Sequence, residues 1–564
     1  MSKTAWLLFL FIGGILLYGL HIGQLDVYSL DEARNAGCAR EMWKRGDYIV
    51  PTFNHQLREQ KPPLHYYFMA LGYTLFGFGA WAARVFSVLA GVATLISTYL
   101  FAARYLGEAV ARWASVVLLV STHFSIQIHM AVPDPYLIFF NTVGTWGLFV
   151  GFVEKKSAYL WAAYIAIGLG SLCKGPIGVV MPGLGVFLYL IASSRFTWSN
   201  ILRFQPFLGL GLILLIALPW YFAVHYATQG AWTRAFFFTQ NLERFGTAME
   251  GHGGIFLLTW AYVFLGLLPF GVYLWPALVK AWRDRLAHQE AIGFCLWAGA
   301  AILCIFSVSS TKLPNYTVPL YPFWAVLLGY YLVNFEFKPS NALMRWLAVG
   351  FYAFLSLALP LGLYLALAFD KTLSPQAYLA LSFLFLPLGG GLALWYMYQQ
   401  NFRAVCIVQA VSFAMLTLVF FGFAFPPVDK ENPVFVARQK IDLKKPLFAY
   451  QAFNPAFVFY AQKEIPVLGN ISELRQALNK HPEAYIISRE DRLDSLSQVK
   501  ELKLRLKRKD LFEIPTTIIL QKPRWSNPQA PGIDKKIGLL SVLPLSWQKF
   551  ICEWDGIPTL FCKK

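Results

Sequence analysis

The sequence predicts an all-α polytopic membrane domain followed by a small soluble α/β domain. Of its 564 residues, 57% are hydrophobic and only 14% are charged, whereas a soluble protein carries roughly a quarter charged residues. Apolar runs recur along the chain up to about Phe425, and each approaches the ~20 residues that cross a bilayer as a helix. Beyond Phe425 the composition becomes that of a soluble domain.

The apolar runs predict about thirteen transmembrane helices. Two further runs, 64–79 and 231–245, are shorter or amphipathic, which is typical of helices that lie at the membrane interface. The expected spans are 5–23, 82–103, 109–125, 132–153, 158–172, 175–193, 205–226, 255–279, 290–308, 317–334, 344–368, 375–398 and 403–424.

Lys and Arg are distributed unequally between the two sets of short loops, and this asymmetry predicts the orientation. One set, together with the N-terminus, holds thirteen of these residues, whereas the opposite set holds Lys174, Lys312 and Lys371. The richer set is expected in the cytoplasm, and so is the N-terminus. The loops 24–81 and 227–254 and the C-terminal region are then expected outside.

The composition break predicts a transmembrane domain at 1–425 and a C-terminal α/β domain at 426–564. In the second domain, PLFAY, PAFVFY, EAYIIS and TTIILQ are typical of strands. Residues 471–481 predict an amphipathic helix with Ser472 as its N-cap. The alternating run 503–510 predicts an exposed edge strand.

The net charge of +18 indicates anionic lipid partners. Nucleic acid is not expected as a partner, because the basic tail is predicted to lie outside the cytoplasm. Cys552 and Cys562 lie in that tail, where oxidising conditions permit a disulfide. Spacing alone does not decide whether the two cysteines pair.

Acidic residues occur at two of the predicted external helix ends. Asp31 and Glu32 follow the first span, where acids often cap a helix and contribute about 1 kcal/mol; this interpretation suits Glu32. A carboxylate beside hydrocarbon is otherwise a functional hypothesis, and Asp134 opens the fourth span. Asp31 and Asp134 are therefore candidate catalytic residues. Asp134 has a natural ion-pair partner in Lys174, and such a pair can also be purely structural.

Cations and one tyrosine at external turns could form a phosphate-binding pocket. Arg34, Arg58 and Lys61 lie in the first external loop, and Lys61 opens a turn stiffened by two prolines. Arg binds phosphate bidentately and Lys offers a point charge, although both also bind lipid headgroups non-specifically. Tyr316 lies at another external helix end, where Tyr is otherwise an aromatic-belt residue.

A divalent metal site is a further hypothesis. His252, in the MEGHGG loop, and Glu59 could act as ligands. Two ligands on separate loops form an incomplete set, and the alternative for His252 is a solvent-exposed loop histidine.

Together, these motifs resemble those of the integral-membrane glycosyltransferases of the C superfamily, which use polyprenyl-phosphate sugars. Within that superfamily the chain is most similar to the 4-amino-4-deoxy-L-arabinose lipid A transferases and the related protein mannosyltransferase-like enzymes. The motifs that carry the resemblance occur in order along the chain and are DEARNA, QKPPLHYY, VPDPYL, CKGP, NLERF with the following His252, and TKLPNYTVPLYP.

The resemblance implies a donor and an acceptor. The donor would be undecaprenyl phosphate carrying one sugar, the best candidate being 4-amino-4-deoxy-L-arabinose. The acceptor would be a lipid A phosphate on the periplasmic face of the bacterial inner membrane. The same chemistry with another pentose or hexose, onto another glycolipid or onto protein, stays open.

The resemblance also implies roles for individual residues. Asp31 matches the essential first-loop acid, and Asp134 and Lys174 match further polar residues of the cavity. The donor-phosphate contacts would be Arg34, Lys61 and Tyr316, and the metal ligands would be Glu59 and His252. Gln60 stands directly before Lys61, where the family pattern has a Glu, so this departure puts metal binding in question.

A lipid or sugar transporter is the alternative from another functional class. Transporters place ionisable residues near the membrane midplane and contain inverted repeats. The spans of this sequence are nearly free of midplane charge, and its large external loops favour surface chemistry.

Overall fold

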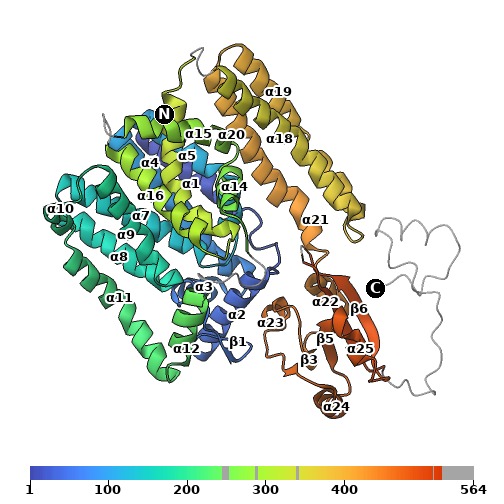
Figure 1. Ribbon diagram of the computed structural model, residues 1–564. Helices are drawn as coiled ribbons and strands as arrows, with labels where there is room; N and C mark the ends of the chain where they lie inside the picture. The colour runs from blue at the N-terminus through green and yellow to red at the C-terminus, as the bar shows by residue number, and fades with distance from the viewer. Residues whose placement is uncertain (244–252, 286–289, 338–341, 512, 524–564) are drawn as a thin grey trace.

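The computed structural model describes residues 1–243, 253–285, 290–337, 342–511 and 513–523. Figure 1 shows a helical body, a row of long helices (α18, α19 and α20) beside it, and a small sheet below that row. The helices account for nearly all the regular structure before Asp429, and the larger of the two sheets lies entirely after it.

Eight helical segments of the described chain are long and apolar enough to cross a membrane. Two bent helix pairs raise the number to ten if each counts as one span. The bent pairs are α5 (Glu108–Leu119) with α6 (Thr122–Ile128), and α14 (Phe256–Gly266) with η2 and α15 (Phe270–Asp284). The eight segments are α4 (Ala80–Leu106), α7 (Asp134–Glu154), α11 (Pro206–Ala227), α16 (Glu290–Val308), η3 with α17 (Pro314–Val333), α18 (Ala342–Phe369), η5 with α19 (Ser374–Tyr398), and α20, η6 and α21 together (Phe402–Asp429).

The predicted number of about thirteen spans is not confirmed. Helices occupy all thirteen predicted positions, but α1 (Lys3–Gly19) and α9 (Ile177–Ala192) have 17 and 16 residues. At 1.5 Å per residue these helices are roughly 25 Å long, shorter than the ~30 Å hydrocarbon core. α8 (Ser157–Lys174) is also absent from the set of eight. Hydropathy locates an apolar run but does not reveal where its helix begins, bends or ends.

Small residues let neighbouring helices pack closely in the helical body. A Cβ placed on Gly329 of α17 would lie 2.6 Å from the backbone nitrogen of Ala114 in α5, so only glycine fits there. Contacts of this kind are typical of helix pairs in membranes. Since α17 continues directly from η3 (Pro314–Leu320), this close packing also fixes the turn that carries Tyr316.

The first external loop folds into short elements. They are α2 (Leu30–Arg45), the antiparallel strands β1 (Thr52–Phe53) and β2 (Gln56–Leu57), and α3 (Leu64–Phe76). α2 ends at Gly46, whose φ of 68° is left-handed and therefore favours glycine. The predicted interfacial helix at 64–79 corresponds to α3. The one at 231–245 corresponds, over its described part, to α12 (Ala231–Arg234) and the π-helix η1 (Ala235–Glu243).

A five-stranded mixed sheet follows the helices, with the order β4-β3-β5-β7-β6. β3 pairs in parallel with β4 and β5, whereas β7 pairs antiparallel with β5 and β6. The run predicted as an edge strand is β6, at one end of the sheet. The strands are β3 (Leu447–Tyr450), β4 (Val467–Leu468), β5 (Tyr485–Arg489), β6 (Lys503–Lys509) and β7 (Thr516–Gln521).

Two local predictions in this region are wrong. PAFVFY forms a helix, α23 (Ala456–Ala461), rather than a strand. Asn454 lies just before the N-cap Pro455, and its Oδ1 accepts a 2.9 Å hydrogen bond from the Ala456 N–H; this Asx turn favours a change of chain direction over the β-propensity of the aromatic run. The N-cap of α24 (Ile471–Lys480) is Asn470, not Ser472, because the Asn470 side chain accepts from the Glu473 N–H.

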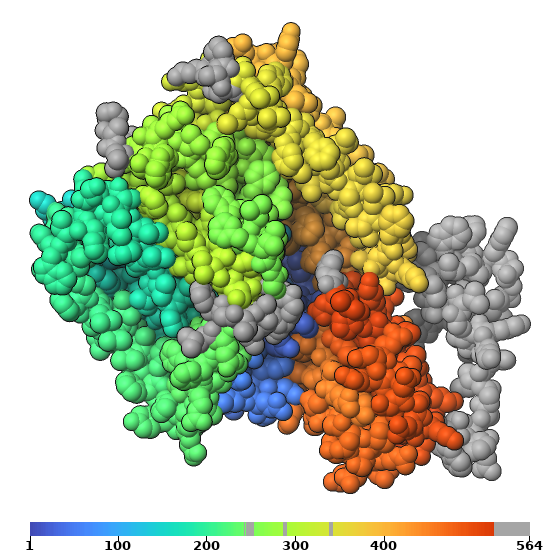
Figure 2. Space-filling view, in the orientation of Figure 1, coloured from blue at the N-terminus to red at the C-terminus, as the bar shows by residue number. Residues whose placement is uncertain are grey.

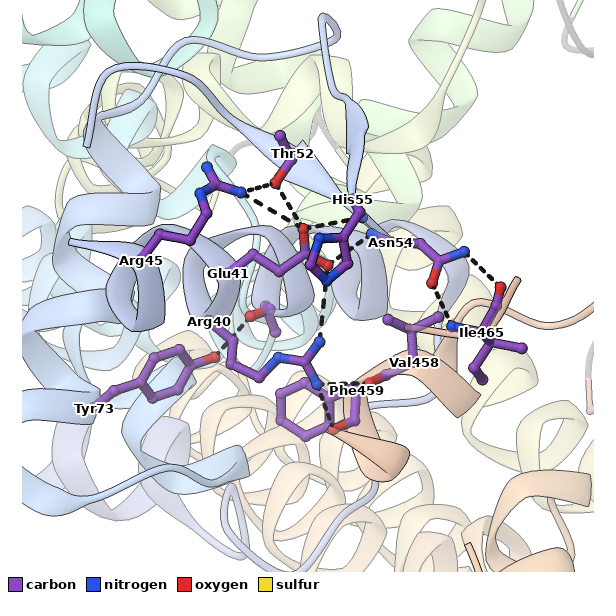
Figure 3. A network of polar contacts seen from close by, with 11 residues as sticks. Arg40, Glu41, Arg45, Thr52, Asn54, His55, Tyr73, Val458, Phe459 and Ile465 are labelled. Carbon is purple, nitrogen blue, oxygen red and sulfur yellow. Dashed lines mark hydrogen bonds and ion pairs between the residues drawn. The ribbon is translucent and has the colours of Figure 1, made fainter. Parts of the chain in front are cut away.

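The sheet region and the first external loop are bonded directly to each other. Figure 2 shows the orange-to-red C-terminal part lying against the blue N-terminal part. In Figure 3, the Arg40 guanidinium donates to the Val458 carbonyl at 2.7 Å. The Asn54 amide donates to the Ile465 carbonyl at 2.9 Å and accepts from the Ile465 N–H at 2.8 Å. These bonds hold α2 and the β1–β2 hairpin in one orientation.

Candidate active site

The predicted site residues surround one cavity of about 270 Å³, here called the catalytic cavity. Two helix starts, two external turns and one helix end contribute to its wall. Seven of the nine candidates line it, namely Asp31, Arg34, Arg58, Lys61, Asp134, Lys174 and Tyr316. Residues up to 285 positions apart in the sequence therefore meet in space, although their chemical roles stay predictions.

The first turns of α2 place one acid and one cation on the cavity wall. Asp31, Arg34 and Asn35 are three and four positions apart, so they share one helix face, and all three line the cavity. No hydrogen bond or ion pair joins Asp31 to another described residue, and its side chain is exposed. Asp31 is therefore available to a ligand.

Glu32, the next residue, points elsewhere. Its carboxylate forms a buried, two-pronged ion pair with Arg84, at 2.7 and 2.8 Å. It also accepts a 2.7 Å hydrogen bond from the Ala131 N–H. Glu32 therefore joins α2 to α4 and to the turn before α7. The expectation that it caps α2 is wrong in this respect, because a cation 52 residues away holds its carboxylate.

Arg58 is held rigidly beside the cavity. Its guanidinium donates to Asn35 Oδ1 at 3.0 Å and to the Tyr66 hydroxyl at 3.1 Å, and the residue is 6% exposed. Its backbone carbonyl accepts from the Trp232 indole at 2.9 Å. An arginine fixed in this way offers a preorganised positive charge.

Asp134 and Lys174 form the ion pair that the sequence predicts. The Lys174 ammonium lies 2.6 Å from Asp134 Oδ1, and the Asn315 amide donates to the same oxygen at 3.2 Å. Lys174 also lies 5.1 Å from the centre of the Tyr316 ring, within cation–π range. Asp134 is thus already occupied by protein groups, and its clearest role is to hold Lys174 at the cavity.

A second, smaller cavity adjoins the first. It measures about 110 Å³ and shares Gln60, Lys61, Lys174, Gln240 and Tyr316 with the catalytic cavity. Its further lining is mostly apolar, with Ile177, Phe236 and Phe306. This cationic cavity combines positive charge with hydrocarbon, which suits a lipid phosphate.

His65 is a buried neighbour that sequence reasoning missed. It is fully buried on α3. Burial lowers the pKa of His65 well below its ordinary value, and the positive charges of Arg58 and Lys61 lower it further. The imidazole is therefore neutral at pH 7.

The described residues do not assemble a metal site. They contain no group of three or more His, Cys, Asp and Glu side chains that could hold an ion. Glu59 is not among the residues that line the catalytic cavity, and His252 lies outside the described residues. Gln60 lines the cavity where the family pattern has a Glu, and its amide oxygen has no hydrogen-bond partner among the described residues. The metal therefore stays an untested prediction.

Four neutral polar residues in the cavity wall carry no signal that marks them in the sequence. Asn315 is the one that could have been found, because it directly precedes Tyr316 in TKLPNYTVP. The others are noticed only once the chain is folded. The four are Asn35, Gln127, Gln240 and Asn315.

Known proteins share this fold and resemble this sequence. The family of dolichyl-phosphate-mannose-protein mannosyltransferases matches residues 60–222. The crystal structure of ArnT from Cupriavidus metallidurans bound to undecaprenyl phosphate superposes with a TM-score of 0.75 at 20% identity, covering 92% of this chain and 98% of that one. At that identity the superposition shows a common fold.

The sequence relatives indicate the chemistry. The undecaprenyl phosphate-alpha-4-amino-4-deoxy-L-arabinose arabinosyl transferase of Edwardsiella ictaluri is 29% identical over 61% of this chain and 62% of its own length. Over about three fifths of its length, the chain is similar to polyprenyl-phosphate-sugar-dependent glycosyltransferases. These relatives and the apolar helices indicate a multi-pass membrane enzyme. A protein of Aquifex aeolicus is 28% identical over 80% of this chain and 86% of its own length.

The match to the named transferases is partial. The chain spans about three fifths of the length of the Edwardsiella ictaluri enzyme, 62%, and of the enzyme from Pseudomonas fluorescens, 61% at 31% identity. Sugar and acceptor therefore have to be argued from the site.

Proposed function

We propose that this enzyme transfers 4-amino-4-deoxy-L-arabinose from undecaprenyl phosphate to a phosphate of lipid A. The proposed location is the periplasmic face of the inner membrane, where the external loops and the C-terminal region would lie. The observation that carries this proposal is the catalytic cavity, in which an unpartnered carboxylate, Asp31, meets the cations Arg34, Lys61 and Lys174. The names of the sequence relatives support the choice of sugar.

The cations suit the leaving group. In the transfer, the bond between the anomeric carbon and the donor phosphate oxygen breaks, and the electron pair leaves with undecaprenyl phosphate. Negative charge then grows on that phosphate while the sugar gains oxocarbenium character. Arg34, Lys61 and the Tyr316 hydroxyl are the proposed contacts of the phosphate. Each preorganised contact of this type typically contributes 10²–10³ in rate.

The acceptor determines what Asp31 does. A phosphate monoester with a second pKa near 6 is already an anion at neutral pH, so its oxygen can attack the anomeric carbon without a base. Asp31 would then orient the sugar or stabilise its developing positive charge.

A hydroxyl acceptor on another glycolipid or on protein is the second candidate. The same unpartnered state of Asp31 favours it, because a hydroxyl must lose its proton and a free carboxylate nearby can take it. In that reaction Asp31 is the general base. The new bond again forms from the acceptor oxygen to the anomeric carbon.

The experiment uses the full chain purified in detergent, with undecaprenyl-phosphate aminoarabinose and lipid A. We expect lipid A to gain one aminoarabinose by mass, and undecaprenyl phosphate to be released without any membrane gradient. Lys61→Ala should lower the rate about a hundredfold, whereas Lys44→Ala, on the exposed part of α2, should leave it unchanged. Donor consumption with no change in lipid A mass would refute the acceptor, and no donor cleavage would refute the function and favour transport.

A further inference from the structure

Besides the cationic cavity, a second branch of adjoining cavities leads away from the catalytic cavity. A cavity of about 340 Å³ shares Ser29 and Met130 with the catalytic cavity. A further cavity of about 260 Å³ shares Ile126, Phe420 and Phe421 with that one. Three adjoining cavities therefore run from Asp31 into the layer of membrane helices.

The middle of this branch is acidic. Its lining contains four carboxylates, from Asp26, Glu32, Asp429 and Glu513, and one guanidinium, from Arg84. Arg84 is saturated, because it bonds both Glu32 oxygens and also the backbone carbonyls of residues 22, 25 and 26. Asp26 is paired in turn with Arg438 at 2.7 Å, so the described lining of this acidic cavity offers hydrogen-bond acceptors but no cation that is available to a ligand.

Glu513 is the carboxylate best placed to meet a ligand there. No hydrogen bond or ion pair joins it to another described residue. Burial raises the pKa of Glu513, and the nearby charge of Asp510 raises it further. A ligand with hydrogen-bond donors, such as hydroxyl or amide N–H groups, would satisfy this carboxylate.

The far end of the branch is apolar. Its lining comes from α6, α14, α18, η5, α19, α20 and the π-helix η6 (Phe420–Ala424), and most of its side chains are Leu and Phe. The π-helix forms the wall between the acidic and the apolar cavities, and such π-bulges often occur at functional sites. Because most of these helices are candidate membrane spans, this apolar cavity is level with lipid chains.

The two branches differ in which lipid they accept. The cationic cavity has Lys61 and Lys174 in its wall and no described carboxylate, which favours the donor phosphate. The acidic branch offers an anionic phosphate no comparable contact, because Arg84, the one cation of its described lining, is already saturated. A lipid that places only uncharged donor groups in the acidic cavity, and hydrocarbon beyond it, matches that branch.

We infer that the acidic and apolar cavities hold the acceptor, an acylated lipid. Its phosphate reaches the catalytic cavity, its hydroxyl or amide neck bonds Glu513, and one acyl chain fills the apolar cavity. This inference rests on the proposed function for the identity of the reaction. It adds the route by which the acceptor binds and the residues that select it.

The test measures binding rather than turnover, with lipid A as the probe. Lipid A and its fully deacylated disaccharide bisphosphate are titrated against the full-length protein in detergent by native mass spectrometry. Thr417→Phe, which adds a ring at the wall of the apolar cavity, should weaken lipid A binding about tenfold through lost acyl contact. It should leave binding of the deacylated probe unchanged. Val411→Phe is the matched control, because Val411 lies on the same helix and is 53% exposed.

A second variant keeps the inference testable if Thr417→Phe fails to fold. Glu513→Gln should weaken binding of both probes about threefold to tenfold, because a charged acceptor is replaced by a neutral amide. Glu490→Gln, in the short helix η7 (Glu490–Arg492) and paired with Lys507, should change neither. The inference is wrong if wild-type protein does not bind lipid A, if both variants bind it normally, or if phosphatidylglycerol shows the same losses as lipid A.

Transfer assays on the same samples separate this inference from the proposed function. If both variants bind lipid A normally and transfer the sugar to it normally, the proposed function is supported and the proposed acceptor-binding cavities are wrong. If both variants weaken lipid A binding but no sugar is transferred to lipid A by the wild-type protein, the acceptor-binding cavities are supported and the proposed reaction is wrong.

Discussion

The N-terminal and C-terminal parts of α2 show how one helix separates chemistry from support. In the N-terminal part, Asp31 and Arg34 line the catalytic cavity. In the C-terminal part, Arg40 and Glu41 are 3% and 6% exposed, and Figure 3 shows each bonded to neighbouring segments. Glu41 accepts from the Thr52 hydroxyl at 2.6 Å and from the Asn54 N–H at 2.7 Å. Arg40 donates to carbonyls of α23.

The difference teaches how to distinguish the two kinds of charge. A buried charge destabilises a fold unless protein groups satisfy it, so a buried charge that protein groups hold serves structure. A charge that faces a cavity without a partner among the described residues is available to a ligand. By this criterion Asp31 is the candidate for the reaction, whereas Arg40 and Glu41 support the fold.

The largest effect is expected at the Asp134–Lys174 pair, because its two charges line the cavity and also hold each other in an ion pair. Lys174→Met removes a cation from the cavity and leaves a buried carboxylate unpaired. We expect the transfer rate to fall about 10²–10³-fold and the free energy of unfolding to fall by about 3–5 kcal/mol. Turnover assays and thermal unfolding of the purified protein measure the two effects.

The double variant Asp134→Leu/Lys174→Met sharpens this result. Removing both charges should restore most of the stability but none of the activity. If the double variant regains the transfer rate, the pair is structural only and Lys174 does not contact the reacting groups.

A purely structural effect is expected in the C-terminal part of α2. Arg40→Met leaves the Val458 carbonyl without its 2.7 Å hydrogen bond, so the free energy of unfolding should fall by about 1–3 kcal/mol. The transfer rate per folded molecule should stay within twofold of wild type. Arg505→Met, on the exposed part of β6, is the control for stability. A hundredfold loss of rate without unfolding would show that the two parts of α2 do not have separate roles.

A smaller effect concerns pH. The folded pKa of His65 is lowered by burial, so unfolding takes up a proton at any pH below the ordinary value near 6.5. Stability should therefore be complete above that pH and fall by about 1.4 kcal/mol per unit below it. His65→Phe should remove this part of the decline in melting temperature between pH 7.5 and 5.0. His481→Phe, with a side chain that is 46% exposed, should leave the decline as it is.

The sequence predicted the residues that line the catalytic cavity better than the hydrogen bonds and ion pairs that hold the surrounding elements in place. Asp31, Lys61, Asp134 and Lys174 could be found because charges next to apolar runs are conspicuous, and because span ends on one side of a membrane must come together. The bonds from Glu32 to Arg84 and from Asn54 to Ile465 could not be found, since they join residues 52 and 411 positions apart. Pairing over such distances depends on packing that no local pattern encodes.

The same limit applies elsewhere. Hydropathy predicted about thirteen spans, a number that the eight to ten apolar segments of the described chain do not confirm, and it does not show that α5 and α6 bend by 63°. In the sheet region, propensity favoured a strand at PAFVFY, whereas this segment forms a helix after a turn in which Asn454 bonds the Ala456 N–H.

The central claim is that the first turns of α2 perform chemistry, and Asp31→Asn tests it most directly. This change keeps the shape of the side chain and removes its charge. We predict that kcat for sugar transfer falls at least a hundredfold, while the melting temperature stays equal to that of wild type and of the exposed-site control Asp491→Asn. A kcat within twofold of wild type would contradict the account.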